Sequence, residues 1–262
     1  MADEKPKDIL TYTKWLKDKH GVEILPTTRN HYDSVTNKVK RDFEQSVFWT
    51  EMVRNFKTYD EEYLAKTGYR LFAQETKEVY IKPYSSLFEK TRRKNILENS
   101  NWPNPPADGW ILPNNWYSKI NDIVRTLFVV KYLDGTRFLA EKVRSLCGQT
   151  GLEFKMFYEA RDDGYYGVHL YARQNFEIPK LTWDTERVDL SVEMQVTTQL
   201  QEAIRRMLHK YYEGRRARLQ DEVRWQWDYK SEEFGANYLG HILHYVEGMI
   251  MEIIEKQREK TP

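Results

Sequence analysis

The chain has 262 residues and a mass of 31.6 kDa, enough for one large domain or two small ones. Its 41 Lys and Arg residues nearly balance 40 Asp and Glu residues, which excludes attraction to nucleic acid through net charge. Its mean hydropathy of −0.79 excludes an integral membrane protein. The charged start MADEKPKDIL is unlike a signal peptide, and one cysteine excludes an internal disulfide, so we expect a cytoplasmic protein without membrane contact.

Helical patterns dominate the first hundred residues. Apolar residues recur there at helical spacing, and glycines end two of the runs. A segment with four prolines then predicts a loop. In chain order the sequence predicts helices over 8–20, 32–56 and 60–66, a strand over 79–81, a basic amphipathic helix over 85–97 and a loop over 99–115.

The second half of the chain contains β-branched and alternating runs, which are typical of strands. It predicts strands over 120–132, 152–158, 165–172 and 187–197, and helices over 137–146, 198–212, 215–229 and 237–256. We expect an α+β fold in which helices flank a small mixed sheet of about five strands. The expected parts are an N-terminal helical extension (1–75), a core (76–213) and a C-terminal helical extension (214–262), in one compact domain.

Two strands carry polar side chains suited to chemistry. In the run RVDLSVEMQV, Glu193 and Gln195 share the polar face, which is typical either of a solvated edge strand or of a cleft floor whose carboxylate takes a proton or a metal. In the run GYYGVHLY, Tyr165 and His169 share a face, and Gly164 and Gly167 beside Tyr165 allow the flat face of another molecule to approach the backbone closely. That pattern suits either packed aromatics or a site that stacks a nucleobase, as does the 14% aromatic content of the chain.

Acidic and basic groups also precede the longest buried strand. Asp122 lies at its start, where a carboxylate can hold Mg²⁺ together with phosphates; the alternative role, a helix N-cap, is weakened because a strand follows. Lys82, Lys90, Arg92 and Arg93 lie on or beside one predicted helix, which favours either a phosphate cradle or an ordinary solvated face.

The order of these groups resembles the synthetase domain of the RelA/SpoT family. The matching elements, over about residues 80 to 210, are Lys82-(x3)-Ser86-(x3)-Lys90, Asp122-Ile123, Gly164-Tyr165-(x3)-His169 and Val192-Glu193-Met194-Gln195-Val196-(x)-Thr198. Members of that family have a nucleotidyltransferase-like core and transfer pyrophosphate from ATP to the ribose 3′ oxygen of an acceptor nucleotide. The resemblance therefore implies an ATP-dependent pyrophosphokinase.

The resemblance implies a role for each matching residue. Asp122 and Glu193 would be catalytic and would handle Mg²⁺, and Tyr165, His169 and Gln195 would bind the acceptor. The implied contacts to the ATP phosphates are Lys82, Ser86 and Lys90, with Arg92 and Arg93 as helpers and Arg125 replacing a lost arginine. The family pattern is altered at Tyr80, Arg125, Leu127, Tyr166, Gly167 and Thr197, which puts the identity of the acceptor in doubt.

Length and departures together resemble small alarmone synthetases, particularly the toxic branch of toxin–antitoxin systems, some members of which modify the 3′ CCA end of tRNA. The acceptor would then be GDP, GTP, ATP or tRNA, and an antitoxin protein would be a partner. A basic stretch after the last strand fits either an RNA site or a solvated helix, and its candidate residues are Arg205, Arg206, Arg215 and Arg216. The alternative function is a catalytically inert nucleotide-binding regulatory module.

Overall fold

The structure is a computed structural model that describes residues 4–74, 77–180, 184–216 and 225–259, the side chains of 208–216 and of Glu259 excepted. This part of the chain forms eight α-helices and one mixed sheet of six strands, which confirms the predicted α+β class with one strand more than expected. The chain divides into two compact units. The first comprises Met1–Trp49, Val79–Arg125 and Ala172–Glu193, and the second comprises Thr50–Glu78, Thr126–Tyr171 and Met194–Pro262.

Three helices open the chain, where two long patterns and one short pattern had been predicted. They are α1 (Ile9–His20), α2 (Pro26–Glu44) and α3 (Val47–Thr67). Helix α1 ends as predicted at Gly21, whose φ of 65° is the left-handed conformation that glycine adopts at helix ends. The single helix predicted over 32–56 is wrong. The chain breaks before α3, where the Ser46 hydroxyl caps the new helix by accepting a hydrogen bond from the Trp49 N–H (3.2 Å).

The six strands pair in the order β1-β3-β6-β5-β4, and β2 also pairs with β3. Their bounds are β1 (Phe72–Gln74), β2 (Val79–Ile81), β3 (Val124–Val130), β4 (Glu153–Ala160), β5 (Tyr166–Pro179) and β6 (Thr185–Thr198). The short strand β1 is the one that the sequence did not predict. It runs antiparallel to β3, with Phe72 opposite Val130 and an irregularity before Gln74. Because β6 lies between β3 and β5, the edge-strand interpretation of the run that holds Glu193 is wrong.

Five further helices and two short helical segments connect and follow the strands. They are α4 (Tyr84–Arg92), a π-helical segment (Arg93–Leu97), α5 (Trp116–Lys119), α6 (Leu133–Gln149), α7 (Gln199–Arg216), a 3₁₀ turn (Trp225–Trp227) and α8 (Glu232–Glu259). Helix α6 joins β3 to β4, so this connection passes over two intervening strands. The helix predicted over 215–229 falls largely on 217–224, which lie outside the described residues.

Aromatic rings in the first unit pack mainly against one another. Tyr12 and Tyr32 are fully buried on α1 and α2, and Trp15, Trp102 and Trp110 form a cluster with ring centroids 5.0–6.3 Å apart. The amide of Asn95 fixes the proline-rich loop to this cluster because it exchanges two hydrogen bonds with Ile111 and donates a third to the Tyr12 hydroxyl. Much of the aromatic content predicted to serve either a core or a stacking site therefore serves packing.

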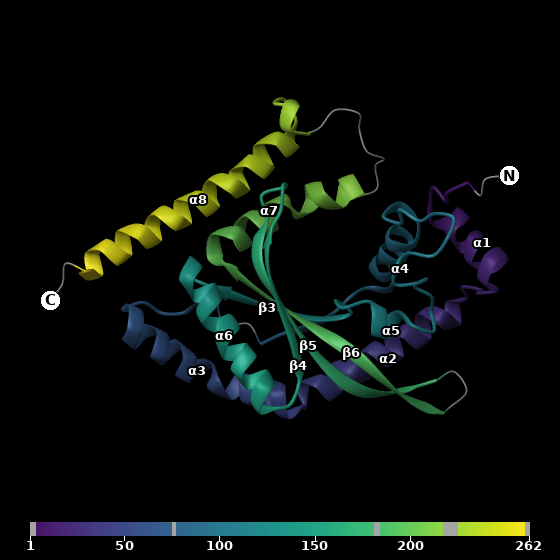
Figure 1. Ribbon diagram of the computed structural model, residues 1–262, viewed down its shortest axis with the longest axis horizontal. Coiled ribbons are helices and arrows are strands. Elements are labelled where there is room, and N and C mark those ends of the chain that lie inside the picture. Colours follow the sequence, from purple (N-terminus) through teal and green to yellow (C-terminus); the bar gives the residue numbers. More distant parts are fainter. Residues whose placement is uncertain (1–3, 75–76, 181–183, 217–224, 260–262) are drawn as a thin grey trace. The chain divides into compact units, whose positions relative to one another are not determined.

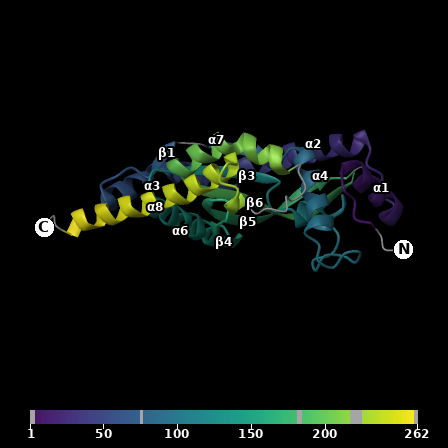
Figure 2. The same ribbon diagram turned by 90° about the horizontal axis from the view of Figure 1, so that it is seen from above.

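The second unit has its own core around α6, α7 and α8. The Phe56 ring contacts Phe72 and Phe128 at 5.2 and 5.5 Å, and Leu139 and Val143 of α6 are fully buried. Helix α8 packs along α7 (Figure 1; Figure 2). Among the helices in the described ranges, none combines the length and the apolar character needed to cross a membrane.

Candidate active site

Two lysines enclose the carboxylate of Asp122 in the first unit. Lys82 Nζ lies 2.8 Å from Asp122 Oδ2, and Lys90 Nζ lies 2.9 Å from Asp122 Oδ1. The three side chains are only 11%, 14% and 20% exposed, for Lys82, Asp122 and Lys90 respectively. The structure thus brings together three residues to which the family resemblance assigns roles in ATP binding and catalysis. We call this partly desolvated group the Asp122 cluster.

Local structure holds each member of the Asp122 cluster in place. The Lys82 N–H donates to the Ile123 carbonyl (2.8 Å), and the Lys82 carbonyl accepts a hydrogen bond from the buried Tyr32 hydroxyl (2.7 Å). Lys90 lies on α4, two turns beyond Lys82, and Asp122 stands two residues before β3. A strand end and a helix, both packed against α2, are therefore the rigid supports of the cluster.

The charges of the cluster favour an anionic ligand. Burial alone would raise the pKa of Asp122, but the ammonium groups of Lys90 and Lys82 outweigh burial and lower the pKa to about 2. The positive charge of Arg125 also acts on Lys82. Two ammonium groups thus contact one ionised carboxylate, a third positive charge acts on Lys82, and the positive excess suits a polyphosphate.

Asp122 also has the donor type that Mg²⁺ requires. In the described ranges, no three His, Cys, Asp or Glu side chains gather as a metal site of their own. Mg²⁺ commonly binds one or two carboxylates and takes its other ligands from water and substrate phosphates. An ionised carboxylate beside two ammonium groups fits that mode. Asp122 would hold the ion, with Glu193 as the second predicted carboxylate, and the ion would neutralise charge on the triphosphate.

Glu193 is buried on β6, the strand between β3 and β5, and is only 4% exposed. Gln195, two residues on, is half-buried in the same strand. A carboxylate buried to this degree must be hydrogen-bonded, paired or protonated, so it does not belong to a solvated polar face.

The other cations that were predicted to help with ATP lie in ion pairs along their own segment. The Arg92 guanidinium contacts Glu89 and donates to the Lys7 carbonyl (3.0 Å), and Arg93 pairs with Glu98 at 2.7 Å. Ser86 is exposed on the first turn of α4. Of this group, the structure places only Lys82 and Lys90 on Asp122.

Tyr165 and His169 come together in the second unit. The Tyr165 hydroxyl lies 2.9 Å from His169 Nε2, and the half-buried Tyr165 ring carries the Arg161 guanidinium 4.9 Å from its centroid. Arg161 was not predicted from the sequence, although the tight Arg-Asp-Asp-Gly turn before Tyr165 is a signal that could have indicated it. An aromatic ring, a guanidinium and an imidazole are groups that stack on or bind a nucleotide.

The sequence suggested that the glycines beside Tyr165 leave space for a flat ligand, and the structure shows that the chain itself fills this space. A Cβ on Gly164 would stand 2.3 Å from the Asn237 carbonyl oxygen of α8, so this glycine gives way to a helix of the same chain. A Cβ on Gly167 would stand 2.6 Å from the Tyr165 hydroxyl, so the second glycine makes room for the Tyr165 ring itself.

The basic stretch on α7 is tied to an acidic partner. Arg205 and Arg206 both bind Glu202, with Nε–O distances of 2.6 and 2.7 Å, and they lower the pKa of this carboxylate in spite of its burial. The side chains of Arg215 and Arg216 lie outside the described part of the structure. The two described arginines therefore form local helix pairs, and their role in RNA binding stays a prediction.

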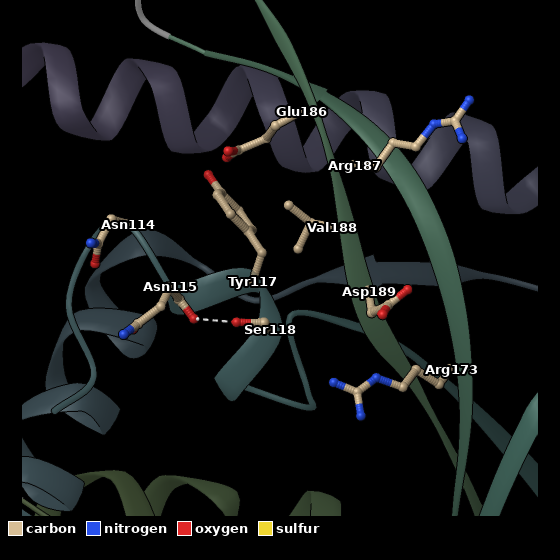
Figure 3. A pocket seen from close by; sticks show the side chains of 9 residues that line it. All are labelled: Asn114, Asn115, Tyr117, Ser118, Arg173, Glu186, Arg187, Val188 and Asp189. Carbon is tan, nitrogen blue, oxygen red and sulfur yellow. Dashed lines mark hydrogen bonds between the residues drawn. The ribbon is translucent and has the colours of Figure 1, made fainter. Parts of the chain in front are cut away.

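A polar cavity of about 270 Å³ lies elsewhere in the first unit (Figure 3). Side chains of α5 and of the loop before it face β5 and β6 across the cavity, and no site residue predicted from the sequence lines it. Its lining includes Asn114, Asn115, Tyr117, Arg173, Glu186 and Asp189. The lining holds positively and negatively charged side chains and two side-chain amides, so the cavity differs from the cation-rich Asp122 cluster.

Comparison with known proteins is informative at the level of structure. No protein-family model and no curated protein matches the chain. A GTP pyrophosphokinase family protein from Streptococcus pneumoniae aligns with a TM-score of 0.52 and 14% identity, over 88% of this chain and 92% of that chain. Small alarmone synthetase 1 from Bacillus subtilis, bound to its product pppGpp, aligns with a TM-score of 0.51 and 13% identity, over 87% and 94%.

The chain has the synthetase fold of these proteins. The alignments cover 87–88% of this chain and 92–94% of the two neighbours. At this level of identity the match shows the fold alone, and an activity has to be argued from the side chains.

Proposed function

We propose that the protein is a Mg²⁺-dependent pyrophosphokinase that transfers pyrophosphate from ATP to the ribose 3′ oxygen of an acceptor. The single observation that carries this proposal is the Asp122 cluster, in which Lys82 and Lys90 meet on one carboxylate. These are also the residues that the RelA/SpoT-like pattern assigns to the ATP phosphates and the metal, on a chain with the matching fold.

The chemistry assigned to the site is a single displacement at phosphorus. The acceptor 3′ oxygen bonds to the β-phosphorus of ATP, the bond between that phosphorus and the α,β-bridging oxygen breaks, and AMP leaves. The proton of the 3′ hydroxyl passes to a carboxylate, for which we propose Glu193. Lys82 and Lys90 hold the triphosphate and Asp122 holds Mg²⁺, because phosphoryl-type transfer depends mainly on positioning and charge neutralisation.

The lysines would change partners when the substrate binds. In the structure Lys82 and Lys90 neutralise Asp122. Asp122 would hold Mg²⁺ when the ion is bound, and the two ammonium groups would then pair with phosphate oxygens of ATP. Neither the carboxylate nor the lysines are then left as unpaired charges in a partly buried site, which would be costly.

Transfer of label from ATP tests the proposal. ATP labelled in the γ-phosphate is incubated with Mg²⁺ and, separately, with GDP, GTP, ATP or total tRNA, and the products are resolved by chromatography. We expect label to move to at least one acceptor and AMP to appear in equal amount. Label on tRNA alone would identify an RNA-modifying toxin, for which an antitoxin partner is expected. Absence of any transfer would reject the proposal and favour the inert nucleotide-binding module.

Tyr165 is proposed to stack on the acceptor base. Replacing it with alanine is expected to remove a contact worth about 1–3 kcal/mol, so that the KM of the acceptor rises while the KM of ATP changes little. Tyr165→Phe is the matched control, because it keeps the ring and loses only the hydroxyl contact to His169. Steady-state transfer with each substrate varied in turn measures both constants. An equal rise in both KM values would contradict the assignment.

A further inference from the structure

Helix α8 meets the turn before Tyr165 backbone to backbone. Gly164 has a φ of 78°, and a Cβ there would collide with the Asn237 carbonyl oxygen at 2.3 Å. The contact is reciprocal, since a Cβ on Gly240 would stand 2.4 Å from the Gly164 carbonyl oxygen. Paired glycines allow this approach, and any side chain at either position would push the helix and the turn apart.

The residue after Tyr165 is fixed by the same helix. The Tyr166 ring stacks on the His244 ring with centroids 3.7 Å apart and planes only 6° from parallel. The Tyr166 hydroxyl lies 2.9 Å from His241 Nδ1, and His241 Nε2 lies 3.0 Å from the Asp162 carbonyl. A carbonyl only accepts, so Nε2 carries the proton and Nδ1 accepts from the Tyr166 hydroxyl.

The helix is itself anchored at the crossing point. The side-chain amide of Gln201, in the first turn of α7, donates to the Gly240 carbonyl (3.3 Å), and Asn237 is fully buried. Both chain neighbours of Tyr165 are therefore held by α8. The Tyr165 side chain itself contacts Arg161 and His169.

We propose that α8 is the positioning element for the acceptor tyrosine, with Tyr166, His241 and His244 as positioning residues. This inference rests on the proposed function, because it assigns to the Tyr165 ring the base of the acceptor. The contacts of α8 with Gly164 and Tyr166 fix the backbone on both sides of Tyr165 and so preorganise its ring for binding. Loss of these contacts lowers the fraction of molecules in which the ring has the binding-competent orientation. Acceptor binding then weakens, and the ATP site is unchanged.

Separate KM values for the two substrates test the proposal. In the full chain, His244→Ala removes the stacked ring, and the milder Tyr166→Phe removes only the hydroxyl contact. We expect the acceptor KM to rise about three- to tenfold in His244→Ala and less in Tyr166→Phe, with the ATP KM unchanged. Tyr245→Ala is the control on the exposed side of the same helix and should leave both constants unchanged. Equal changes in both KM values, or none, would overturn the proposal.

Amide hydrogen exchange tests whether α8 holds the turn before Tyr165, and this measurement requires no enzymatic activity. Peptides that cover 161–169 should exchange faster in His244→Ala than in the wild type, while peptides around Asp122 keep their protection. Unchanged protection of 161–169 would show that α8 does not hold the turn, and would overturn the inference even if transfer is observed. If the wild type transfers no label to any acceptor, the proposed function fails. The hydrogen-exchange measurement still decides whether α8 holds the turn before Tyr165.

Discussion

Replacement of Asp122 by asparagine is expected to reduce transfer by at least about 100- to 1,000-fold. The amide keeps the size of the side chain but loses the charge that would hold Mg²⁺ and that neutralises Lys82 and Lys90. Initial rates at saturating ATP and acceptor measure the effect. Asp42→Asn is the matched control, since Asp42 forms a half-exposed ion pair with Lys38 on α2 and should keep wild-type turnover.

The Asp122 variant must be compared as a folded protein. Loss of the Asp122 carboxylate leaves two partly buried lysines without their partner. The substitution therefore lowers the free energy of unfolding as well as the activity. Circular dichroism below the melting transition separates the two effects. A folded Asp122→Asn protein with normal turnover would show that the carboxylate has no part in the reaction.

The second large effect concerns Glu247 and pH. This carboxyl on α8 is 4% exposed, and burial raises its pKa to about 7, with Thr198 and Gln201 offsetting only part of the rise. The folded state therefore holds a proton that the unfolded chain releases near pH 4.5. The contribution of Glu247 to the free energy of unfolding is therefore greatest below pH 4.5, and about 3 kcal/mol of it is lost as the pH rises from 4.5 through 7.

Glu247→Gln is expected to remove this loss, because the amide stays neutral at every pH. The free energy of unfolding of the variant, relative to the wild type, should increase by about 3 kcal/mol between pH 4.5 and pH 8 in denaturant titrations. Glu252→Gln is the control on the exposed side of α8, paired with Lys256, and should show no such rise. If the free energy of unfolding depends on pH in the same way in the wild type and in Glu247→Gln, Glu247 is ionised in the folded protein.

Local pattern was enough to predict much of the fold and the elements that carry the candidate residues. The apolar run of β3 placed Asp122 at the start of a strand, and the pattern after β2 placed Lys90 on a helix and Lys82 beside it. The structure adds that the two ammonium groups share this carboxylate across 32 to 40 residues of chain. That convergence depends on how β2 and β3 pair, which no local period encodes.

Long-range packing explains the errors. Glu193 lies in an alternating run that is typical of an edge strand, but β3 pairs with β6 and buries the residue. Gly164 had the pattern of a ligand-facing glycine, yet it packs against a helix more than seventy residues later. The break at Ser46 depends on one hydroxyl cap within an uninterrupted apolar pattern.

The central claim is that the Asp122 cluster binds the triphosphate and its metal, and a crystal structure with Mg²⁺ and a non-transferable ATP analogue tests it most directly. The account predicts Mg²⁺ on the Asp122 carboxylate, with Lys82 and Lys90 Nζ within hydrogen-bonding distance of phosphate oxygens. A complex in which both lysines stay on Asp122 while the nucleotide binds elsewhere would contradict it.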